Sequence, residues 1–337
     1  MVISVNIIQL NQKDSNLNNC RPNFFVIGAA KAGTSTICKL LELHPKVFFS
    51  PIKEPNHFCE DIDPNKFSKR IRSLYFLDKN FFSEEKKHKQ HAAFIQSRSD
   101  YLSLFNGADG FTAVGEGSVS YLFSTHAAAA MHRFNPNAKI IVILRDPVSR
   151  AFSHYKMDKM LGLQDNSFEK AIENDFNVLE KGWGVSHLYI ELGLYSKQLE
   201  RFMRYFQGDQ IKIVWYDDFL VSPGCVMREI FDFLKVEQIN ISADGRKENI
   251  SRAPRFPIAH RGLRNVYDFF YLKKFFGSKI NKLVKDVVFK KNNEELTEKQ
   301  KKFMLQFFLT DIQELEVMCK RDLSNWKQSN VVKNCEY

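Results

Sequence analysis

Short apolar runs alternate with amphipathic stretches through the first two thirds of the chain. The apolar runs have the length of β-strands and lie at 23–27, 47–49, 112–116, 139–144 and 210–216. The run at 139–144, KIIVIL, is the most apolar, is too short for a helix and is flanked by turns. Such a run is typical of a central strand in a parallel sheet, which is buried on both faces.

Between these strands the spacing of apolar residues predicts helices at 35–43, 98–105, 125–134 and 147–161 and within 185–206. Pro147 stands at a helix start, where its missing N–H costs nothing. Strands that alternate with helices imply right-handed crossovers and a parallel sheet covered on both faces. The sequence therefore predicts an α/β fold.

Beyond residue 235 the strand signals stop, and the C-terminal third is predicted to be helical. Thr297 and Gln300 have the spacing of a capping box. They precede an apolar helix face that consists of Phe303, Phe307 and Leu315. We expect this face to be buried.

The composition is that of a globular chain. Of 337 residues, 44% are hydrophobic and 26% charged, which excludes a disordered or fibrous protein. We predict a polar N-terminal arm at 1–20 and a single domain at 21–330. No run reaches the ~20 apolar residues of a transmembrane helix, and the N-terminus does not resemble a signal peptide. The six cysteines are scattered, so we expect reduced thiols, no metal site and a cytoplasmic location.

The segment GAAKAGTST, at 28–36, joins the first predicted strand to its helix. A loop in this position directs backbone N–H groups and the positive end of a helix dipole at one point, which suits a phosphate-like anion. It is not a Walker A loop, because its lysine is Lys31 and not the residue after Gly33. The position of this loop between the first strand and its helix nevertheless resembles that of a P-loop. We predict a P-loop-like three-layer α/β fold with a central parallel sheet and a helical C-terminal third.

This loop resembles that of the sulfotransferases that use 3′-phosphoadenosine 5′-phosphosulfate (PAPS), whose pattern is G-x-x-K-x-G-T followed by Ser or Thr. Their second element is a strand leading into Arg-[Asp/Asn]-Pro with a serine eight positions after the arginine, matched here by Arg145 and Ser153. A third pattern, K-E-P-x-x-F, is matched at 53–58. Further matches extend the resemblance from about residue 23 to residue 327. Its nearest form is the bacterial sulfotransferase-domain proteins related to heparan-sulfate sulfotransferases.

The resemblance implies a PAPS-dependent sulfotransferase that needs no metal. At the loop, the phosphosulfate is expected to contact Lys31, Ala32, Gly33, Thr34, Ser35 and Thr36. The 3′-phosphate of the donor is a second anion, and its expected partners are Arg145, Ser153 and Arg255. Cations and N–H dipoles at the first site would stabilise the charge that develops on the bridging oxygen as the sulfuryl group leaves.

The acceptor must lose a proton as it attacks, which requires a base. The resemblance implies that Glu54 is this base, with His57 and Glu116 as open alternatives. Many relatives have lysine directly after the equivalent of Glu116. Here that residue is Gly117, so a second cation is either absent or supplied by Lys53.

The formal net charge of +10 is concentrated in residues 246–291, which hold thirteen basic and three acidic residues. This placement favours an anionic acceptor or surface and argues against nucleic acid. A P-loop kinase or NTPase with a displaced lysine is the rival enzyme, and a binder of polyanions or membranes through the Phe-rich stretch at 261–291 is the rival binding protein. A carbohydrate or small-molecule acceptor is expected to contact loops at 61–97 and 156–184 and the basic C-terminal segment. Its identity, the choice of oxygen or nitrogen, and the oligomeric state are not set by the sequence.

Overall fold

A computed structural model describes residues 21–84, 87–240, 252–254, 289–291 and 294–328. Within these residues the chain divides into two compact units that alternate along the sequence. The first unit holds residues 21–146, 179–188 and 194–240, and the second holds residues 147–178, 189–193 and the described residues from 252 onward. The single domain at 21–330 stays a prediction.

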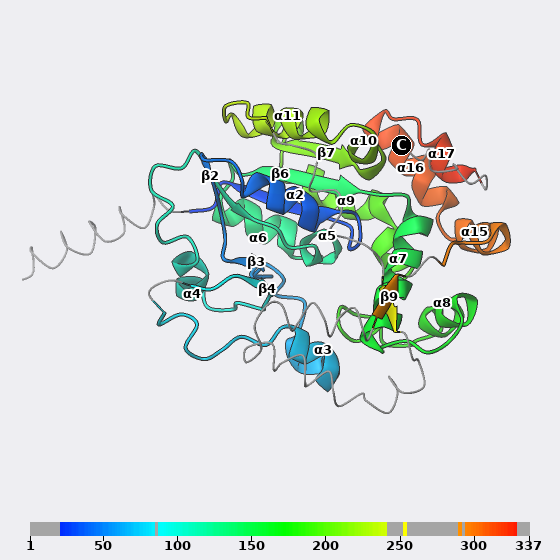
Figure 1. Ribbon diagram of the computed structural model, residues 1–337. Helices are drawn as coiled ribbons and strands as arrows, with labels where there is room; N and C mark the ends of the chain where they lie inside the picture. Colours follow the sequence, from blue (N-terminus) through cyan, green and yellow to red (C-terminus); the bar gives the residue numbers. More distant parts are fainter. Residues whose placement is uncertain (1–20, 85–86, 241–251, 255–288, 292–293, 329–337) are drawn as a thin grey trace, which may run out of the picture. The chain divides into compact units, whose positions relative to one another are not determined.

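The first unit is built on a five-stranded parallel sheet (Figure 1). Its strands lie in the order β2 (Val47–Phe49), β5 (Ala113–Glu116), β1 (Phe24–Gly28), β6 (Lys139–Leu144) and β7 (Ile211–Trp215). All of β1 is buried, and so is all of β6 after Lys139. The predicted parallel sheet with KIIVIL as a buried central strand is confirmed.

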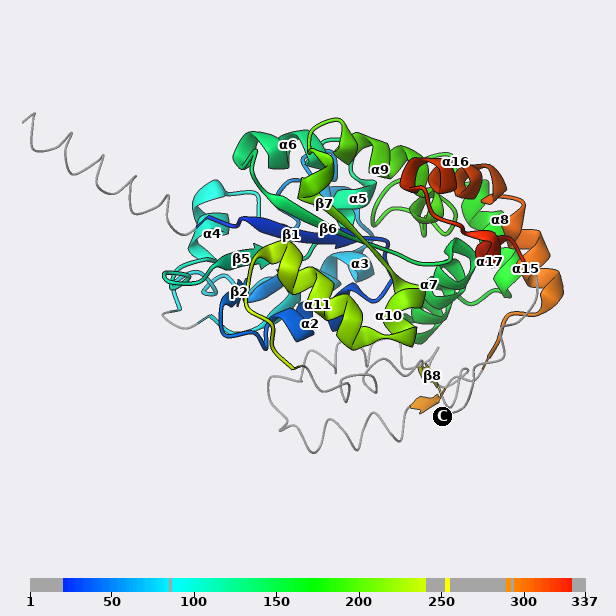
Figure 2. The same ribbon diagram turned by 90° about the horizontal axis from the view of Figure 1, so that it is seen from above.

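Helices cover both faces of this sheet (Figure 2). One face carries α2 (Thr34–Leu41) and α11 (Pro223–Leu234), and the other carries α5 (Ser120–Phe123), α6 (Ala127–Phe134) and α9 (Tyr195–Met203). The crossover from β1 to β2 runs across the sheet in the direction opposite to those that end at β6 and β7. Right-handed crossovers in opposite directions put their helices on opposite faces, which gives the predicted three layers.

Between β2 and β5 lie short elements, most of which the sequence pattern did not predict. β3 (Ile52–Glu54) pairs in parallel with β4 (Gln90–Ala92), and three residues are too few to reveal a period of two. The Gly117 N–H donates to the Lys53 carbonyl at 2.9 Å, which joins β3 to the chain leaving β5. The remaining short elements of the unit are η1 (Pro64–Lys66), α3 (Lys69–Leu74), α4 (Arg98–Ser103), η3 (Gly208–Gln210) and α10 (Tyr216–Val221).

The second unit begins with α7 (Pro147–Leu161), which has the predicted bounds, and continues with α8 (Phe168–Phe176), η2 (Glu191–Gly193), α15 (Glu298–Leu305), α16 (Leu309–Cys319) and α17 (Ser324–Lys327). The expectation that strands stop at residue 235 is wrong. β8 (Arg252–Pro254) pairs antiparallel with β9 (Phe289–Lys291). This pairing uses backbone groups over three residues and leaves no apolar alternation in the sequence.

Two helical predictions need correction. The capping box forms, with Gln300 N–H donating to Thr297 Oγ1 at 3.2 Å and Thr297 N–H donating to Gln300 Oε1 at 3.0 Å. The helix ends at Leu305, however, so that Phe303 and Phe307 are only half-buried. Leu315 is fully buried, as predicted, and the other fully buried residues are Met304, Phe308 and Ile312.

In the stretch 185–206, helix α9 covers only Tyr195–Met203. The residues before it pass from one unit to the other and include Leu188, whose φ of 55° is incompatible with a continuous right-handed helix. Among the described residues no helix is both long and apolar enough to cross a membrane.

Candidate active site

Two glycines shape the loop between β1 and α2. Gly28, Lys31 and Gly33 all have positive φ, at 143°, 74° and 92°. A Cβ on Gly28 would lie 2.3 Å from the Ile143 carbonyl oxygen, and a Cβ on Gly33 would lie 2.8 Å from the Tyr216 ring. Glycine is therefore required at both positions by close contacts as well as by φ.

Helix α2 begins directly after this loop, with Gly33 as its N-cap residue and no side-chain cap. Amides in the first turn of a helix point outward with the positive end of the helix dipole, although in α2 that of Thr36 donates to the Gly33 carbonyl at 3.0 Å. The loop and helix therefore have the geometry of an anion site. Of the predicted donor-binding residues here, Ala32 and Thr34 are buried, whereas Lys31, Ser35 and Thr36 are half-buried.

Arg145 follows β6 and packs against this loop. Its Nη1 donates to the Lys31 carbonyl at 3.0 Å, and its guanidinium carbon lies 4.6 Å from the centre of the Tyr216 ring. The Tyr195 hydroxyl donates to the Arg145 carbonyl at 2.8 Å. The fold thus brings Arg145 to the loop that carries Lys31, although 114 positions separate the two residues.

The other two predicted contacts to the second anion lie elsewhere in the chain. Ser153 is a half-buried residue of α7, in the second unit. Arg255 lies outside the described residues. Their contacts with the donor stay predictions.

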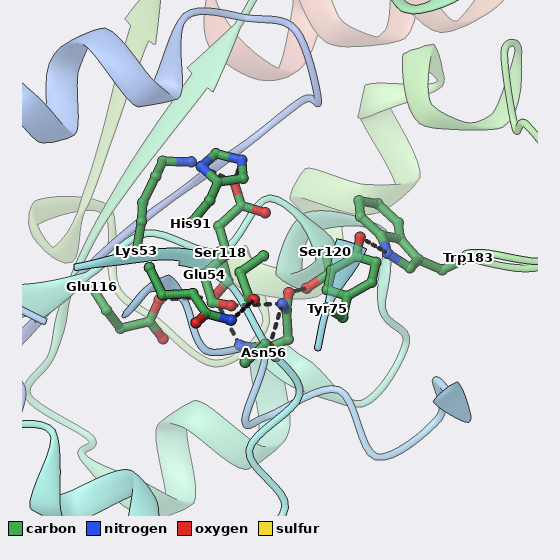
Figure 3. A network of polar contacts seen from close by, with 12 residues as sticks. Lys53, Glu54, Asn56, Tyr75, His91, Glu116, Ser118, Ser120 and Trp183 are labelled. Atoms are coloured by element: carbon green, nitrogen blue, oxygen red, sulfur yellow. Dashed lines mark hydrogen bonds and ion pairs between the residues drawn. The ribbon is translucent and has the colours of Figure 1, made fainter. Parts of the chain in front are cut away.

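At the end of β3, Lys53 and Glu54 form a buried ion pair (Figure 3). Lys53 Nζ donates to Glu54 Oε1, and the two side chains are only 12% and 8% exposed. Burial, the largest single effect, lowers the pKa of Lys53, but the charge and hydrogen bond of Glu54 together with the influence of Cys38 and Glu116 outweigh it, and the pKa is raised. Lys53 is therefore a firmly charged cation beside the candidate base.

His91 on β4 lies next to this pair. Its Nε2 is 3.9 Å from Glu54 Oε1. Although the side chain is largely exposed, its pKa is lowered, first by desolvation and then by the charges of Lys53 and Lys31, against the opposing effect of Glu54. Sequence reasoning missed His91, because β4 was not predicted and no motif includes this residue.

His57, the second candidate base, has different partners. Its Nδ1 bonds to the Ile95 carbonyl at 2.6 Å, and its ring stacks on Tyr101 with centroids 4.1 Å apart. Burial lowers the pKa of this imidazole. His57 also lines a cavity of about 500 Å³ together with Arg98 and Arg133, but Lys53 and Glu54 do not line it.

Glu116, the third candidate base, is completely buried at the end of β5. Its Oε1 accepts from the Tyr121 hydroxyl at 2.6 Å, and its Oε2 accepts from the Ser118 hydroxyl at 2.9 Å. Burial raises the pKa of Glu116 to about 8. Because the carboxyl has no exposed surface, an acceptor arriving from solvent has no access to it.

Comparison with known proteins supports the resemblance that was inferred from the loop and from the strand leading to Arg145. A family model described as "Sulfotransferase domain" matches residues 21–254. This chain belongs to the sulfotransferase domain family. The resemblance inferred from the motifs is thereby confirmed.

Several sulfotransferases are similar to this chain. Rat carbohydrate sulfotransferase 15 is 25% identical over 74% of this chain and 52% of its own length. Mouse heparan sulfate glucosamine 3-O-sulfotransferase 3B1 is 26% identical over 65% of this chain and 47% of its own length. The chain thus spans about half the length of the curated relatives it matches. Among solved structures, a sulfotransferase from Alicyclobacillus acidocaldarius has a TM-score of 0.65 and 26% identity, covering 91% of this chain and 99% of that one.

Packing explains why this member of the sulfotransferase family has glycine after Glu116. A Cβ on Gly117 would lie 2.7 Å from Cys38 Sγ and 3.3 Å from Val26 Cβ. A lysine therefore does not fit at this position. The backbone of Lys53 is hydrogen-bonded to that of Gly117, so Lys53 enters the site directly beside it.

Two half-buried aromatic residues of this chain, Tyr75 and Trp183, lie in the region of Glu54 (Figure 3). The Trp183 indole N–H donates to the Tyr75 hydroxyl at 3.0 Å (Figure 3). The pKa of Tyr75 is raised, first by burial and then by the charge of Glu54. The two residues come from the loops 61–97 and 156–184, in which we expected acceptor contacts.

Tyr216 at the start of α10 is a further residue that sequence reasoning missed. Its ring lies between the cation of Arg145 and the backbone of Gly33. The signal available in the sequence was an aromatic residue at the end of the strand predicted at 210–216, at the edge where parallel strands end. Only the packing reveals its contacts.

Proposed function

We propose that this protein transfers a sulfuryl group from PAPS to a hydroxyl or amine of a carbohydrate acceptor. The observation that carries the proposal is that three features meet at one edge of the sheet: an anion-binding loop with Lys31, the cation Arg145 against that loop, and the buried Lys53–Glu54 pair. Family membership agrees with this chemistry.

The loop amides and Lys31 would hold the phosphosulfate, and Arg145 would contact the 3′-phosphate. Lys31 and Lys53 would stabilise negative charge on the oxygen that bridges phosphorus and sulfur as its bond to sulfur breaks. The Glu54 carboxylate would take the proton of the acceptor while the acceptor atom forms its bond to sulfur from the opposite side. The products are then the sulfated acceptor, 3′-phosphoadenosine 5′-phosphate (PAP) and a protonated Glu54.

Three observations support a carbohydrate acceptor. Curated relatives are named as sulfotransferases of carbohydrates and heparan sulfate. Trp183 and Tyr75 offer aromatic surface with polar tips on the side of Glu54, which suits a ligand that has both apolar faces and hydroxyl groups. The basic segment 246–291, which lies mostly outside the described residues, favours an anionic polymer. Activity on such an acceptor should fall steeply as salt is raised.

Donor binding is tested by thermal shift, because a ligand that binds only the folded state raises its apparent stability. PAP should raise the melting temperature, and Lys31→Ala and Arg145→Ala should each abolish or strongly reduce that shift. The exposed Lys46→Ala serves as the control and should keep the full shift. A shift with ATP but none with PAP would instead support the rival kinase or NTPase.

The role of Glu54 is tested by Glu54→Gln, which keeps the shape of the side chain but removes its basicity. This variant should bind PAP as the wild type does and lose turnover by ~100-fold or more. Undiminished turnover would transfer the role of the base to His57 or His91.

The absence of a metal requirement and the cytoplasmic location stay predictions. The described residues contain no group of three His, Cys, Asp or Glu side chains arranged to hold a metal ion. Turnover that is unchanged in the presence of EDTA would support metal-independent transfer, as expected if cationic side chains stabilise the leaving oxygen.

A further inference from the structure

The turn that follows Glu54 is held by a buried polar network (Figure 3). Pro55 is followed by Asn56, which has a φ of 50° in the left-handed region, where asparagine is one of the few tolerated residues. The Asn56 side-chain amide donates to the carbonyls of Glu54 at 2.8 Å and of Ala93 at 2.9 Å. Ser120 donates to the oxygen of the same amide. The backbone of Glu54 is therefore fixed from its carboxyl side.

The next two backbone amides have side-chain hydroxyls as their partners. The N–H of Asn56 donates to Ser118 Oγ at 3.2 Å, and the N–H of His57 donates to the Tyr121 hydroxyl at 3.1 Å. Both hydroxyls in turn donate to Glu116, Ser118 to Oε2 at 2.9 Å and Tyr121 to Oε1 at 2.6 Å. One buried carboxyl thus holds two consecutive peptide groups through two intermediaries.

This arrangement also orders the charged part of the site. Gly117, the residue after Glu116, donates its N–H to the Lys53 carbonyl at 2.9 Å, so the same strand end is hydrogen-bonded to both sides of the Lys53–Glu54 pair. The carboxyls of Glu116 and Glu54 interact electrostatically, but only that of Glu54 reaches the surface. Glu116 is therefore out of reach of an acceptor and does not have the position of a base.

We propose that Glu116 is a positioning residue, which fixes the orientation of Glu54 by clamping the turn at residues 55–57 through Ser118 and Tyr121. The proposal deepens the proposed function and rests on it, because it assumes that Glu54 acts on the acceptor. A base must be held within hydrogen-bond reach of the proton it takes, and small displacements of a reacting group are costly. A clamp of buried bonds supplies that precision.

Amide hydrogen exchange tests this clamp without an activity assay, because each clamping hydroxyl protects one backbone amide. Ser118→Ala should speed hydrogen exchange of the Asn56 amide, and Tyr121→Phe should speed that of His57, each by at least ~tenfold. Glu116→Ala should speed both. Tyr101→Phe is the matched control, because its hydroxyl also donates to Glu116, at 3.5 Å, but its ring contact with His57 is retained. It should leave both amides protected.

Turnover distinguishes positioning from a merely structural role. With PAPS as donor and heparan sulfate as acceptor, Ser118→Ala and Tyr121→Phe should lower kcat per folded molecule ~10- to 100-fold, with the affinity for PAP unchanged within twofold. Ser124→Ala is the control for a lost buried hydroxyl, because Ser124 bonds to Asp61 and the start of α6 and not to the turn. It should keep kcat within threefold of the wild type.

Combining the substitutions tests whether the effect passes through Glu54. In a Glu54→Gln background, Ser118→Ala should lower the residual rate no further, because the group it positions is already gone. An equal loss of kcat in Ser118→Ala and Ser124→Ala, or protected amides in both clamp variants, would overturn the proposal. Wild-type turnover in Glu54→Gln would instead refute the role of Glu54 in the proposed function, while the exchange rates would still report on the clamp.

Discussion

The buried carboxyl of Glu116 makes the stability of this protein depend on pH in an unusual direction. Its pKa is about 8 in the folded state and 4.5 when unperturbed. Between these values the folded state holds a proton that the unfolded state has lost, so the free energy of unfolding falls as pH rises. The slope from this one group is about 1.4 kcal/mol per pH unit, and over the whole window it amounts to about 5 kcal/mol.

Glu116→Gln removes this titration while keeping an amide of nearly the same shape. We expect the difference in unfolding free energy between variant and wild type to shift in favour of the variant by about 3 kcal/mol between pH 5.5 and 7.5. Urea unfolding followed by tryptophan fluorescence at several pH values measures it. His57 and His91, whose pKa values are lowered, affect both proteins equally and cancel in the difference.

The same exchange at the exposed Glu180 provides the control, because it removes a carboxyl that is not desolvated. The difference in unfolding free energy between Glu180→Gln and wild type should not vary with pH over this range. A difference in unfolding free energy between wild type and Glu116→Gln that stays constant between pH 5.5 and 7.5 would contradict this prediction. Such a result would mean that Glu116 is ionised in the folded state and that its hydroxyl donors outweigh its burial.

Three further predictions concern close packing and the acceptor. Gly28→Ala should lower the free energy of unfolding by several kcal/mol more than Gly107→Ala. Both glycines have positive φ, but only a Cβ on Gly28 would meet the backbone, 2.3 Å from an oxygen. Equal losses in urea unfolding would contradict this. Gly117→Ala should cost about 1–3 kcal/mol, and a second substitution, Cys38→Ala, should recover part of it by removing the Sγ that lies 2.7 Å from the new Cβ. Trp183→Ala should raise KM for heparan sulfate ~tenfold and leave PAP binding unchanged, and an unaltered KM in steady-state kinetics would argue against the acceptor contact.

Most of the sheet could be predicted from the sequence, because its central strands are continuous apolar runs with turns on both sides. The run at 139–144 became β6 without any change of bounds, and the strands at 23–27, 112–116 and 210–216 shifted by about a residue. Four strands of three residues escaped prediction, namely β3, β4, β8 and β9, because so few positions do not establish a period, whereas β2 was predicted as an apolar run at 47–49. The two compact units were also not predicted, since they alternate along the chain and leave no linker to recognise.

The candidate site was predictable only where its residues follow one another in the chain. The loop from Gly28 to Thr36 carries its own chemistry, because backbone amides and a helix N-terminus act locally. Arg145 was found through a motif, but its contact with the Lys31 carbonyl is a product of packing between strands that are adjacent in space. His91 has no local signal at all, because what matters is the pairing of β4 with β3.

By itself, the sequence determined the parallel sheet, the anion-binding loop and the family, since each follows from local patterns of residue type and spacing. The tertiary structure alone decided which carboxyl keeps access to the surface: Glu54 retains a little exposed area and Glu116 has none. Glu54 and Glu116 are both glutamates at strand ends, and nothing in their immediate sequence tells which one an acceptor can reach and which one is completely enclosed. Their environments differ because β3 lies beside the end of β5, where Tyr121 and Ser118 surround one carboxyl and Lys53 holds the other.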